Sequence, residues 1–411
     1  MARHAFPLVN RIIAEHAGRE SVETGELLFA DVDRVYVQDG NSPTIARLYR
    51  EHGLDSVFDP DRVAFVFDHS VLVPNRDMAD RIGEAERFAR NLGVRVYGRG
   101  AGISHLVAME EGWFVPGDLV LGSDSHTCVG GARQSLALGM GATDIAAAMA
   151  TGRTWLKVPE TVWLRVSGTP HPALRPKDVL LEVLRRFGSE TFLYRSVQWT
   201  GSWAESLSED SAGSVASMGV EMGAKCVFLP PRPRSSEGLR STEAGTDDLV
   251  YDLDVSELMP MVALPHSPSD TVPVDRLAGK RVDYVFIGTC TNGRLEDIAE
   301  AARVVRGREI DPTVHFVVTP GSRDTYLDAV AAGHVDTLVR AGALVTPPGC
   351  GACVGTQGSV PETGSTVLTT MNRNFKGRMG NGGADIYLSS PLVAASAALV
   401  GHFPDGEELR L

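Results

Sequence analysis

The sequence predicts an α/β fold made of several units, and three observations lead to that prediction. The chain has 411 residues, too long for one ordinary domain, and its length suggests roughly three. Hydrophobic residues make up 43% and charged residues 22% of the chain, with 43 glycines, as in globular α/β proteins rich in tight turns. Short apolar segments alternate with helical patterns, most regularly in the last third. We expect three units, at residues 1–158, 159–277 and 278–411.

In the first unit, apolar segments are separated by glycine turns and by Asp-Gly and Ser-Pro pairs, which mark turns. Such segments predict strands, and an amphipathic pattern predicts a helix. The expected elements are a helix at 9–16, β structure at 27–37, strands at 63–67, 94–96 and 118–121, and a tightly packed helical region at 130–152. Ligands bind at the carboxyl ends of the strands in parallel sheets of this kind.

Polar side chains follow the strands and glycine turns of this unit. Asp68 and His69 come directly after an apolar strand, and His105 follows a glycine-rich turn. Asp124 and His126 come after a third segment, and in an extended chain residues two apart face the same side. A carboxylate beside a histidine fixes its tautomer and raises its basicity. One such pair is more often structural than catalytic, but three histidines in similar places favour a shared site.

The second unit starts where the pattern changes near residue 158. We expect an alternating strand at 161–166, a helix with Pro176 in its first turn and a strand at 226–229. Glu221 has the context of a surface carboxylate on a helix, and that is its ordinary interpretation. Two polar, proline-rich segments follow. We expect residues 230–248 to form an exposed loop and residues 266–273 to link this unit to the third.

The third unit repeats strand, loop and helix. The expected strands are 281–287, 315–319, 343–345 and 365–370, and the expected helices are 295–305, 324–332 and 391–400. Parallel strands would bring the loops after them to one edge of the sheet. The last loop, 372–380, contains Arg373, Lys376 and Arg378, a local positive charge that suits a carboxylate ligand.

Three of the five cysteines, Cys290, Cys350 and Cys353, lie in glycine-rich loops of this unit, and Cys128 and Cys226 lie elsewhere. Glycine lets the backbone approach a metal centre closely. Structural zinc takes four protein ligands, whereas three thiolates suit an iron-sulfur cluster with one iron free to bind something else. On spacing alone, a pair of buried thiols with an unrelated third is an equally good interpretation.

Charge and cysteine usage exclude several classes of protein. The net charge of −13 argues against nucleic acid or an anionic membrane as the main partner. Five cysteines, an odd number, do not indicate a disulfide framework, and a reducing compartment is expected. Neither a signal peptide nor a membrane span is expected from the apolar runs, and we expect a cytoplasmic protein.

Taken together, the motifs resemble the aconitase superfamily, and within it the isopropylmalate dehydratase branch. The resemblance covers residues 38 to 400 in the family's order. The matching motifs are Phe67-Asp68-His69, Gly122-Ser123-Asp124-Ser125-His126-Thr127, Ile287-Gly288-Thr289-Cys290-Thr291-Asn292-Gly293-Arg294, Gly349-Cys350-Gly351-Ala352-Cys353-Val354-Gly355 and Asn372-Arg373-Asn374-Phe375-Lys376-Gly377-Arg378. The fold that the resemblance implies is three α/β/α domains around an iron-sulfur cleft, without the swivelling fourth domain of single-chain members.

The resemblance also implies a role for each matching residue. Cys290, Cys350 and Cys353 would bind a 4Fe-4S cluster whose fourth iron has no cysteine ligand. The residues implied to bind substrate carboxylates are Arg373, Arg378, Ser125 and Gln38. Asp68 and His69 would protonate the leaving hydroxyl. The residues implied to surround the iron-bound water are His105, Asp124, His126 and Glu221, and those implied to line the cluster are Asn292 and Asn372.

These residue types suit the removal of water from a hydroxy acid. An iron without a cysteine ligand is a Lewis acid for the hydroxyl, and an imidazole paired with a carboxylate supplies the proton. The arginines stabilise charge that develops on the carboxylate when the neighbouring carbon loses its proton. The resemblance implies a separate small subunit, because the chain ends at Leu411 and the swivelling domain carries the serine base and a further arginine.

The expected activity is that of the large subunit of a hydro-lyase, most closely 3-isopropylmalate dehydratase. Homoaconitase, an aconitase-like enzyme and another substituted-malate dehydratase are the alternatives. Gln38 resembles aconitase at a position where the isopropylmalate branch more often has histidine, whereas Ser217 stands where aconitase has an asparagine. From another class, an iron-sensing RNA-binding regulator is an alternative that the net charge disfavours. A relic that keeps the fold without a cluster is a third, and the set of carboxylates, histidines and arginines counts against it.

Overall fold

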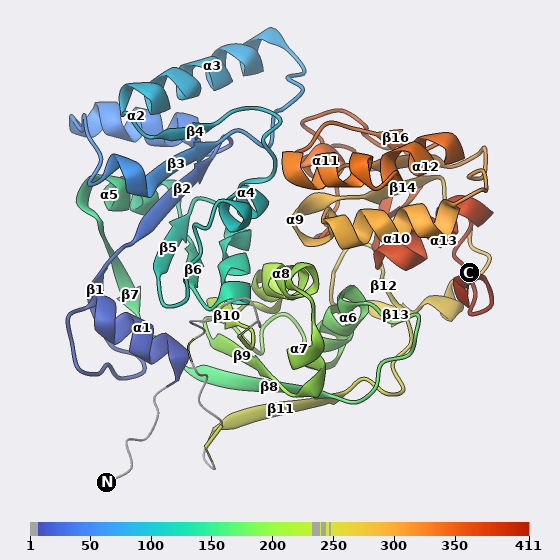
Figure 1. Ribbon diagram of the computed structural model, residues 1–411, viewed down its shortest axis with the longest axis horizontal. Helices are drawn as coiled ribbons and strands as arrows, with labels where there is room; N and C mark the ends of the chain where they lie inside the picture. The colour runs from blue at the N-terminus through green and yellow to red at the C-terminus, as the bar shows by residue number, and fades with distance from the viewer. Residues whose placement is uncertain (1–6, 232–238, 240–243, 246–247, 411) are drawn as a thin grey trace.

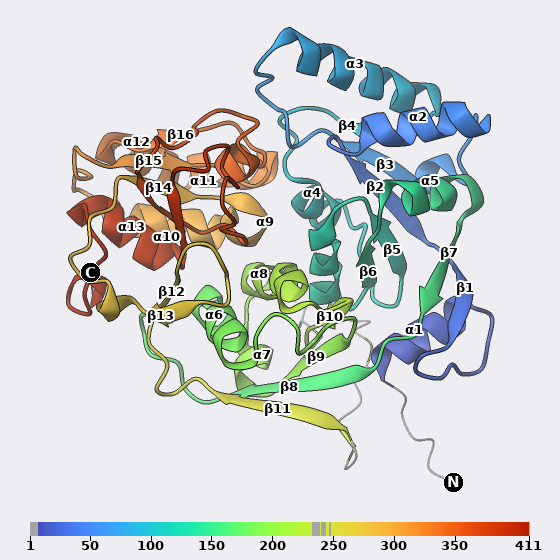
Figure 2. The ribbon, with the colours of Figure 1, turned by 180° about the vertical axis from the view of Figure 1, so that it is seen from behind.

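The computed structural model describes residues 7–231, 239, 244, 245 and 248–410. The described residues form four β-sheets with helices packed on them. Figures 1 and 2 show three lobes that follow each other along the chain and meet at the centre of the molecule, where α4, α8 and α9 lie next to one another in both views. The predicted α/β class with parallel sheets is confirmed.

The first lobe is a five-stranded parallel sheet in the order β4-β3-β2-β5-β6. Its strands are β2 (Arg34–Gln38), β3 (Val63–Val66), β4 (Arg95–Tyr97), β5 (Leu119–Gly122) and β6 (Leu136–Gly139). Its helices are α1 (Leu8–His16), α2 (Ser42–His52), η1 (Pro60–Arg62), α3 (Arg76–Asn91), α4 (Ser104–Glu110), η2 (Ser125–Arg133) and α5 (Ala142–Thr151). A separate antiparallel ribbon joins β1 (Leu27–Asp31) to β7 (Arg153–Lys157).

Every residue of β3 and β5 is buried, as a central strand of a parallel sheet requires. The prediction of one helical region at 130–152 is wrong for residues 136–139, which form β6. Leu136 and Leu138 pack into the core of this lobe, and a short apolar run among small residues does not distinguish a buried strand from a buried helix.

The second lobe is a four-stranded parallel sheet in the order β10-β9-β8-β11. Its strands are β8 (Thr161–Ser167), β9 (Ser196–Thr200), β10 (Cys226–Phe228) and β11 (Leu249–Asp254), and its helices are α6 (Pro176–Phe187), α7 (Ser202–Ser206), α8 (Glu209–Ser217) and η3 (Met218–Met222). The helix predicted to begin at Pro176 is confirmed. The expected exposed loop at 230–248 lies mostly outside the described residues.

The third lobe is a seven-stranded sheet in the order β13-β12-β18-β17-β14-β15-β16. Its strands are β12 (Met261–Ala263), β13 (Thr271–Pro273), β14 (Tyr284–Ile287), β15 (His315–Val318), β16 (Leu344–Val345), β17 (Thr366–Thr369) and β18 (Asp385–Leu388). Its helices are η4 (Val274–Arg276), α9 (Thr289–Asn292), α10 (Leu295–Val305), α11 (Arg323–Ala331), α12 (His334–Ala341), η5 (Gly351–Val354), α13 (Pro391–Val400) and η6 (Glu408–Arg410). Strands β14 to β18 are parallel, and β12 is antiparallel to β13 and β18.

The interpretation of 266–273 as a linker is wrong at its end, because β13 pairs with β12 at the edge of this sheet. Alternation is too short to detect in a strand of three residues that contains proline. The sheet of the third lobe therefore starts at Met261 in the chain, and the expected limits of the three units stay predictions. Among the described residues, the structure contains no helix with the length and apolar character needed to cross a bilayer.

Candidate metal centre

Three cysteine thiols meet where the lobes meet. Cys290 lies in α9, after β14, and Cys350 and Cys353 lie at the start and the third residue of η5, after β16. The three pack in one small cluster with Ile103 and Leu106 of the first lobe. Strands β14 and β16 are parallel members of one sheet, so their carboxyl ends bring the two loops to the same edge. The predicted convergence of the cysteine loops is confirmed.

The other two cysteines are elsewhere. Cys128 is buried and donates a hydrogen bond to the carbonyl oxygen of Ala216 at 3.1 Å. Cys226 lies in β10 of the second lobe, and its buried side chain packs against the core of the first lobe. All five cysteines are free thiols. The three cysteines that lie close together are therefore the three in glycine-rich loops.

Glycine is required in the Cys350 loop for two reasons. Gly351 has φ +57°, and a Cβ there would lie 2.5 Å from Thr319 Oγ1. A Cβ on Gly349 would lie 3.0 Å from the carbonyl oxygen of Asp68, the same oxygen that accepts a hydrogen bond from the Cys350 amide at 3.1 Å. The loop is thus pressed directly against the segment after β3 that carries Asp68 and His69.

We call Asp39, Asp68 and His69 the His69 group. His69 Nδ1 lies 2.7 Å from Asp68 Oδ1 and 3.2 Å from Asp39 Oδ1. Asp68 is fully buried and accepts a hydrogen bond from the Ser104 amide at 2.7 Å, and Asp39 accepts one from the His69 amide at 3.0 Å. One ligand atom each of Asp68, His69 and Cys350 lie within 4.8 Å of one another. An imidazole held by two carboxylates thus lies beside one thiol.

We call Tyr36, His105, Asp124, His126 and Glu221 the His126 group. Asp124 Oδ1 lies 3.0 Å from His105 Nε2 and 3.2 Å from His126 Nδ1, and His126 Nε2 lies 3.1 Å from Glu221 Oε1. Tyr36 Oη lies 2.8 Å from His105 Nδ1. One ligand atom each of His105, His126 and Cys290 lie within 4.8 Å of one another. This group is beside a different thiol.

The predicted proximity of Asp124 and His126 is confirmed, but strand alternation is not its cause. β5 ends at Gly122, and Asp124 is the N-cap of η2, where its side chain accepts a hydrogen bond from the His126 amide at 2.8 Å. The interpretation of Glu221 as a surface carboxylate is wrong. It is 7% exposed in the short helix η3, and its partners come from the first and third lobes.

Asp68, Asp124 and Glu221 are held in the charged form, whereas burial raises the pKa of Asp39. Burial would raise the pKa of Asp124 and of Glu221, but the histidines outweigh it, and the pKa of each is lowered, that of Asp124 well below its usual value. Burial would lower the pKa of His126, yet Glu221 and Asp124 raise it to about 9. Burial would also lower the pKa of His69, but Cys350, Asp68 and Asp39 hold it well above its usual value. Both groups are therefore arranged to hold a proton on an imidazole.

Two arginines of the third lobe complete the centre. Arg373 follows β17 and donates from Nε to Glu221 Oε1 at 2.8 Å and from Nη2 to Ser125 Oγ at 3.1 Å. Arg378 donates from Nη2 to Cys353 Sγ at 3.3 Å. Burial would lower the pKa of Arg378, but Cys353 raises it, so its charge is secure. Arg378, expected from the sequence to bind a carboxylate, thus contacts a cysteine expected to bind a metal.

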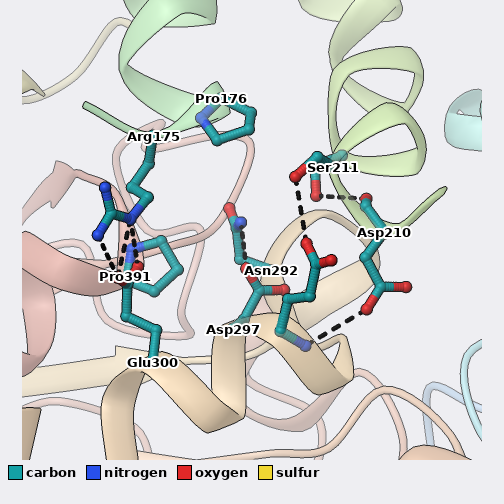
Figure 3. A pocket seen from close by; sticks show the side chains of 10 residues that line it. Arg175, Pro176, Asp210, Ser211, Asn292, Asp297, Glu300 and Pro391 are labelled. Carbon is teal, nitrogen blue, oxygen red and sulfur yellow. Dashed lines mark hydrogen bonds and ion pairs between the residues drawn. The ribbon is translucent and has the colours of Figure 1, made fainter. Parts of the chain in front are cut away.

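The remaining predicted residues lie around this centre. Asn372 donates from Nδ2 to Cys290 Sγ at 3.7 Å. Gln38 is buried at the end of β2. Its side-chain oxygen accepts a hydrogen bond from the Gly40 backbone amide, and its backbone amide donates to Ser123 Oγ at 2.9 Å. Asn292 donates to Asp297 Oδ1 at 2.9 Å and is one of the residues that line a cavity of about 190 Å³ between α8 and α10 (Figure 3).

The donor set fits an iron-sulfur cluster. Burial raises the pKa of Cys350 to about 12 and that of Cys290 well above its usual value, so the thiols need a metal to become thiolates. Glu221 Oε2 and Arg378 Nε are buried without a hydrogen-bond partner among the described residues, as expected of groups that point to something else. A three-cysteine set falls one thiolate short of full cysteine ligation of such a cluster.

Reasoning from the sequence did not find Tyr36 and Asp39. Tyr36 lies on β2 and its partner His105 on α4, so only the fold brings them together. Asp39 and Gly40 form an Asp-Gly pair of the kind that marks a turn. Asp39 also follows directly on the buried strand β2, and Asp68 comes two residues after the end of β3. A search for carboxylates at strand ends would have included Asp39.

Comparison with known proteins agrees with this geometry. The family model described as aconitase family (aconitate hydratase) matches residues 10–280 and 275–401. The large subunit 1 of 3-isopropylmalate dehydratase from Pyrococcus furiosus is 36% identical over 98% of each chain. The corresponding protein of Thermotoga maritima is 38% identical over 97% of this chain and 98% of its own. A probable methanogen homoaconitase large subunit from Methanothermobacter thermautotrophicus is 39% identical over 96% of each chain.

Proposed function

This chain belongs to the aconitase family, and on that basis we propose that it is the large, cluster-bearing subunit of a hydro-lyase. The enzyme would isomerise a 2-hydroxy di- or tricarboxylic acid by dehydration and rehydration. We assign 3-isopropylmalate as the substrate, because relatives with that name match the chain over nearly its whole length. A homoaconitase is the second candidate, favoured by a relative of that name at 39% identity.

One observation carries this proposal. Three thiols, two histidine groups with bound carboxylates and two arginines occupy one buried place, although they come from all three lobes. If the thiols, the histidine groups and the arginines each had a separate structural role, they would not need to lie in one place. Perturbed titratable groups of both signs at one site favour catalysis.

The proposed cofactor is a 4Fe-4S cluster, as the family implies, bound by Cys290, Cys350 and Cys353. We assign no cysteine to its fourth iron, because Cys128 and Cys226 lie in other parts of the core. When bound, the cluster would supply a Lewis acid for the substrate hydroxyl. Asn372, which already contacts Cys290, would line it, and we assign the same role to Asn292.

The protein's own residues would bind the acid and move the proton. Arg373, oriented by Glu221 and Ser125, and Arg378 would each hold a substrate carboxylate, with Gln38 nearby on the adjoining strand end. The His69 group would protonate the leaving hydroxyl, because Asp68 holds Nδ1 of His69 and a ring nitrogen of His69 lies within 4.8 Å of the Cys350 thiol. The His126 group would hold the departing water.

We propose that the partner is a separate small subunit that carries the swivelling domain, since the relatives are named as large subunits. It would supply the base and the contacts to the substrate side chain. Five free thiols suit a reducing compartment, and we assign the protein to the cytoplasm.

The test is anaerobic co-expression with candidate small subunits, followed by assay on isopropylmalate, on homocitrate-derived acids and on citrate. Formation of the unsaturated acid is followed by its ultraviolet absorbance. We expect turnover of isopropylmalate by the two-subunit protein and none by the large subunit alone. Iron-loaded pairs that turn over none of these acids would contradict the proposal, and preference for a homocitrate-derived acid would select the second candidate.

A further inference from the structure

A completely buried lysine lies behind the Arg373 loop. Lys177 is 0% exposed and belongs to the first turn of α6 in the second lobe. Its Nζ donates hydrogen bonds to the carbonyl oxygens of Met371, at 2.6 Å, and Thr370, at 3.2 Å. These two residues are followed directly by Asn372 and Arg373.

The two carbonyl groups lie where the chain leaves its sheet. Strand β17 ends at Thr369, and both Thr370 and Met371 are fully buried. The Thr370 amide still pairs with the carbonyl oxygen of Phe286, but beyond it the ladder stops. A buried carbonyl without a donor is unfavourable, so an external donor is needed to hold this stretch in place. The ammonium of Lys177 is that donor.

Helix formation alone does not explain a lysine at this position. The N-terminus of a helix carries partial positive charge and disfavours a cation. Burial lowers the pKa of Lys177 to about 8, and Glu221 and Cys290 oppose that change. The ammonium is therefore charged at neutral pH, and the Glu221 carboxylate of the His126 group helps to keep it so.

Other residues of the same turn also contact the third lobe. Arg175 Nε donates to Glu300 of α10 at 2.8 Å, and Figure 3 shows this pair beside the cavity below Pro176. Asp178 Oδ1 accepts a hydrogen bond from the Met261 amide of β12 at 3.0 Å. Arg175 and Asp178 thus attach α6 to α10 and β12 of the third lobe, whereas Lys177 reaches the segment that carries Arg373.

We propose that Lys177 is a positioning residue that sets the backbone of residues 370–373, so that Arg373 meets Glu221 and Ser125 and Asn372 meets Cys290. Its consequence for catalysis rests on the proposed function, in which Arg373 binds a substrate carboxylate. The simpler explanation is a general anchor between two lobes, with no special relation to Arg373. The two explanations differ in where the effect of a substitution is felt.

Hydrogen exchange of the full chain distinguishes them without any activity. In Lys177→Met we expect exchange of peptides covering 370–376 to accelerate about tenfold, with peptides of β8 and α11 unchanged, because only the local support is lost. Lys225→Met is the control: Lys225 is half-buried in the same lobe and contacts Tyr194 and Met140. It should leave 370–376 unchanged.

Unchanged exchange at 370–376, or equal acceleration in all peptides, would overturn the proposal. Lys177→Gln, which keeps an N–H donor and loses the charge, serves as a second variant if Lys177→Met does not fold. An increase confined to 370–376 is expected for it too, smaller than that of Lys177→Met.

A double-mutant cycle in the two-subunit enzyme tests the link to Arg373. We expect Lys177→Met to lower kcat/KM about tenfold in the wild-type background and less than about twofold when Arg373→Lys is already present, because Lys177 acts through Arg373. An equal loss in both backgrounds would show a general anchor and overturn the proposal. If the wild-type pair has no activity, the proposed function fails, and the exchange experiment still decides the role of Lys177.

Discussion

The two histidine groups of the centre are built in different ways. The His69 group belongs wholly to the first lobe: Asp68 and His69 are neighbours in sequence, and Asp39 follows the adjacent strand β2. The His126 group takes Glu221 from the second lobe and is fixed by Arg373 from the third. The His69 side chain is 21% exposed, whereas that of His126 is 8% exposed.

Because of this difference, we expect the His69 group to matter mainly for the reaction and the His126 group mainly for the packing of the lobes. The His69 group can form as soon as the first lobe folds, so a change in it should affect proton transfer more than stability. The His126 group forms only when the first two lobes have packed, and Arg373 of the third lobe contacts it. The charges of Asp124, His126, Glu221 and Arg373 balance one another in a buried place. A change there should destabilise the contact between lobes, because it leaves a buried charge without its partner.

The largest expected effect is loss of iron binding when the thiol beside either histidine group is removed. Cys350→Ser, beside the His69 group, and Cys290→Ser, beside the His126 group, should both abolish stable iron binding, because either leaves two thiols for the cluster. Iron and sulfide analysis after anaerobic purification measures this. Cys128→Ser is the control, since serine can still donate to Ala216. Full iron content in either of the first two variants would show that the thiols do not act together.

The next effect is on the reaction. Asp68→Asn should lower kcat of the two-subunit enzyme by about 10²–10⁴-fold, because the amide no longer holds the charged imidazole of His69. The melting temperature should change little in comparison, since Asn can still accept the hydrogen bond from the Ser104 amide. Steady-state kinetics and thermal unfolding of the same preparation measure both quantities. A large loss of stability with unchanged kcat would reverse the comparison between the groups.

A change in the His126 group should act on stability first. Glu221→Gln removes the carboxylate that balances His126 and Arg373, and we expect a loss of about 1–3 kcal/mol in the free energy of unfolding of the metal-free chain. Denaturant titration measures it. The control is Glu205→Gln, on α7 at the surface of the same lobe. Equal stability of both variants would mean that the buried charges do not hold the lobes together.

The smallest effect sharpens the comparison through pH. The pKa values of Cys350 and Cys290 are raised by burial, so both thiols carry protons at neutral pH and a metal must displace them. The affinity of the metal-free chain for Cd²⁺ should therefore rise with pH, by about tenfold per pH unit for each proton displaced. Calorimetric titration between neutral and mildly alkaline pH measures the slope. A slope of zero would show that the thiols are already ionised.

How far the sequence predicts this site depends on where the partners of each residue lie. The His69 pair and the cysteine loops could be predicted, because neighbours in sequence or the ends of parallel strands determine their positions. Glu221 could not be placed from local pattern, since its helical context is that of a surface residue and its burial depends on His126 and Arg373. The strand β6 and the hairpin of β12 and β13 were missed because short apolar or proline-containing runs carry too little periodicity.

The central claim is that three cysteines hold a cluster and leave one iron for the substrate. Mössbauer spectroscopy of the two-subunit protein, reconstituted with isotopically enriched iron, tests this most directly. The account predicts that about one quarter of the iron signal changes when isopropylmalate is added and that the rest does not. A spectrum in which all irons stay equivalent with and without substrate, or a chain that takes up no iron and sulfide, would contradict it.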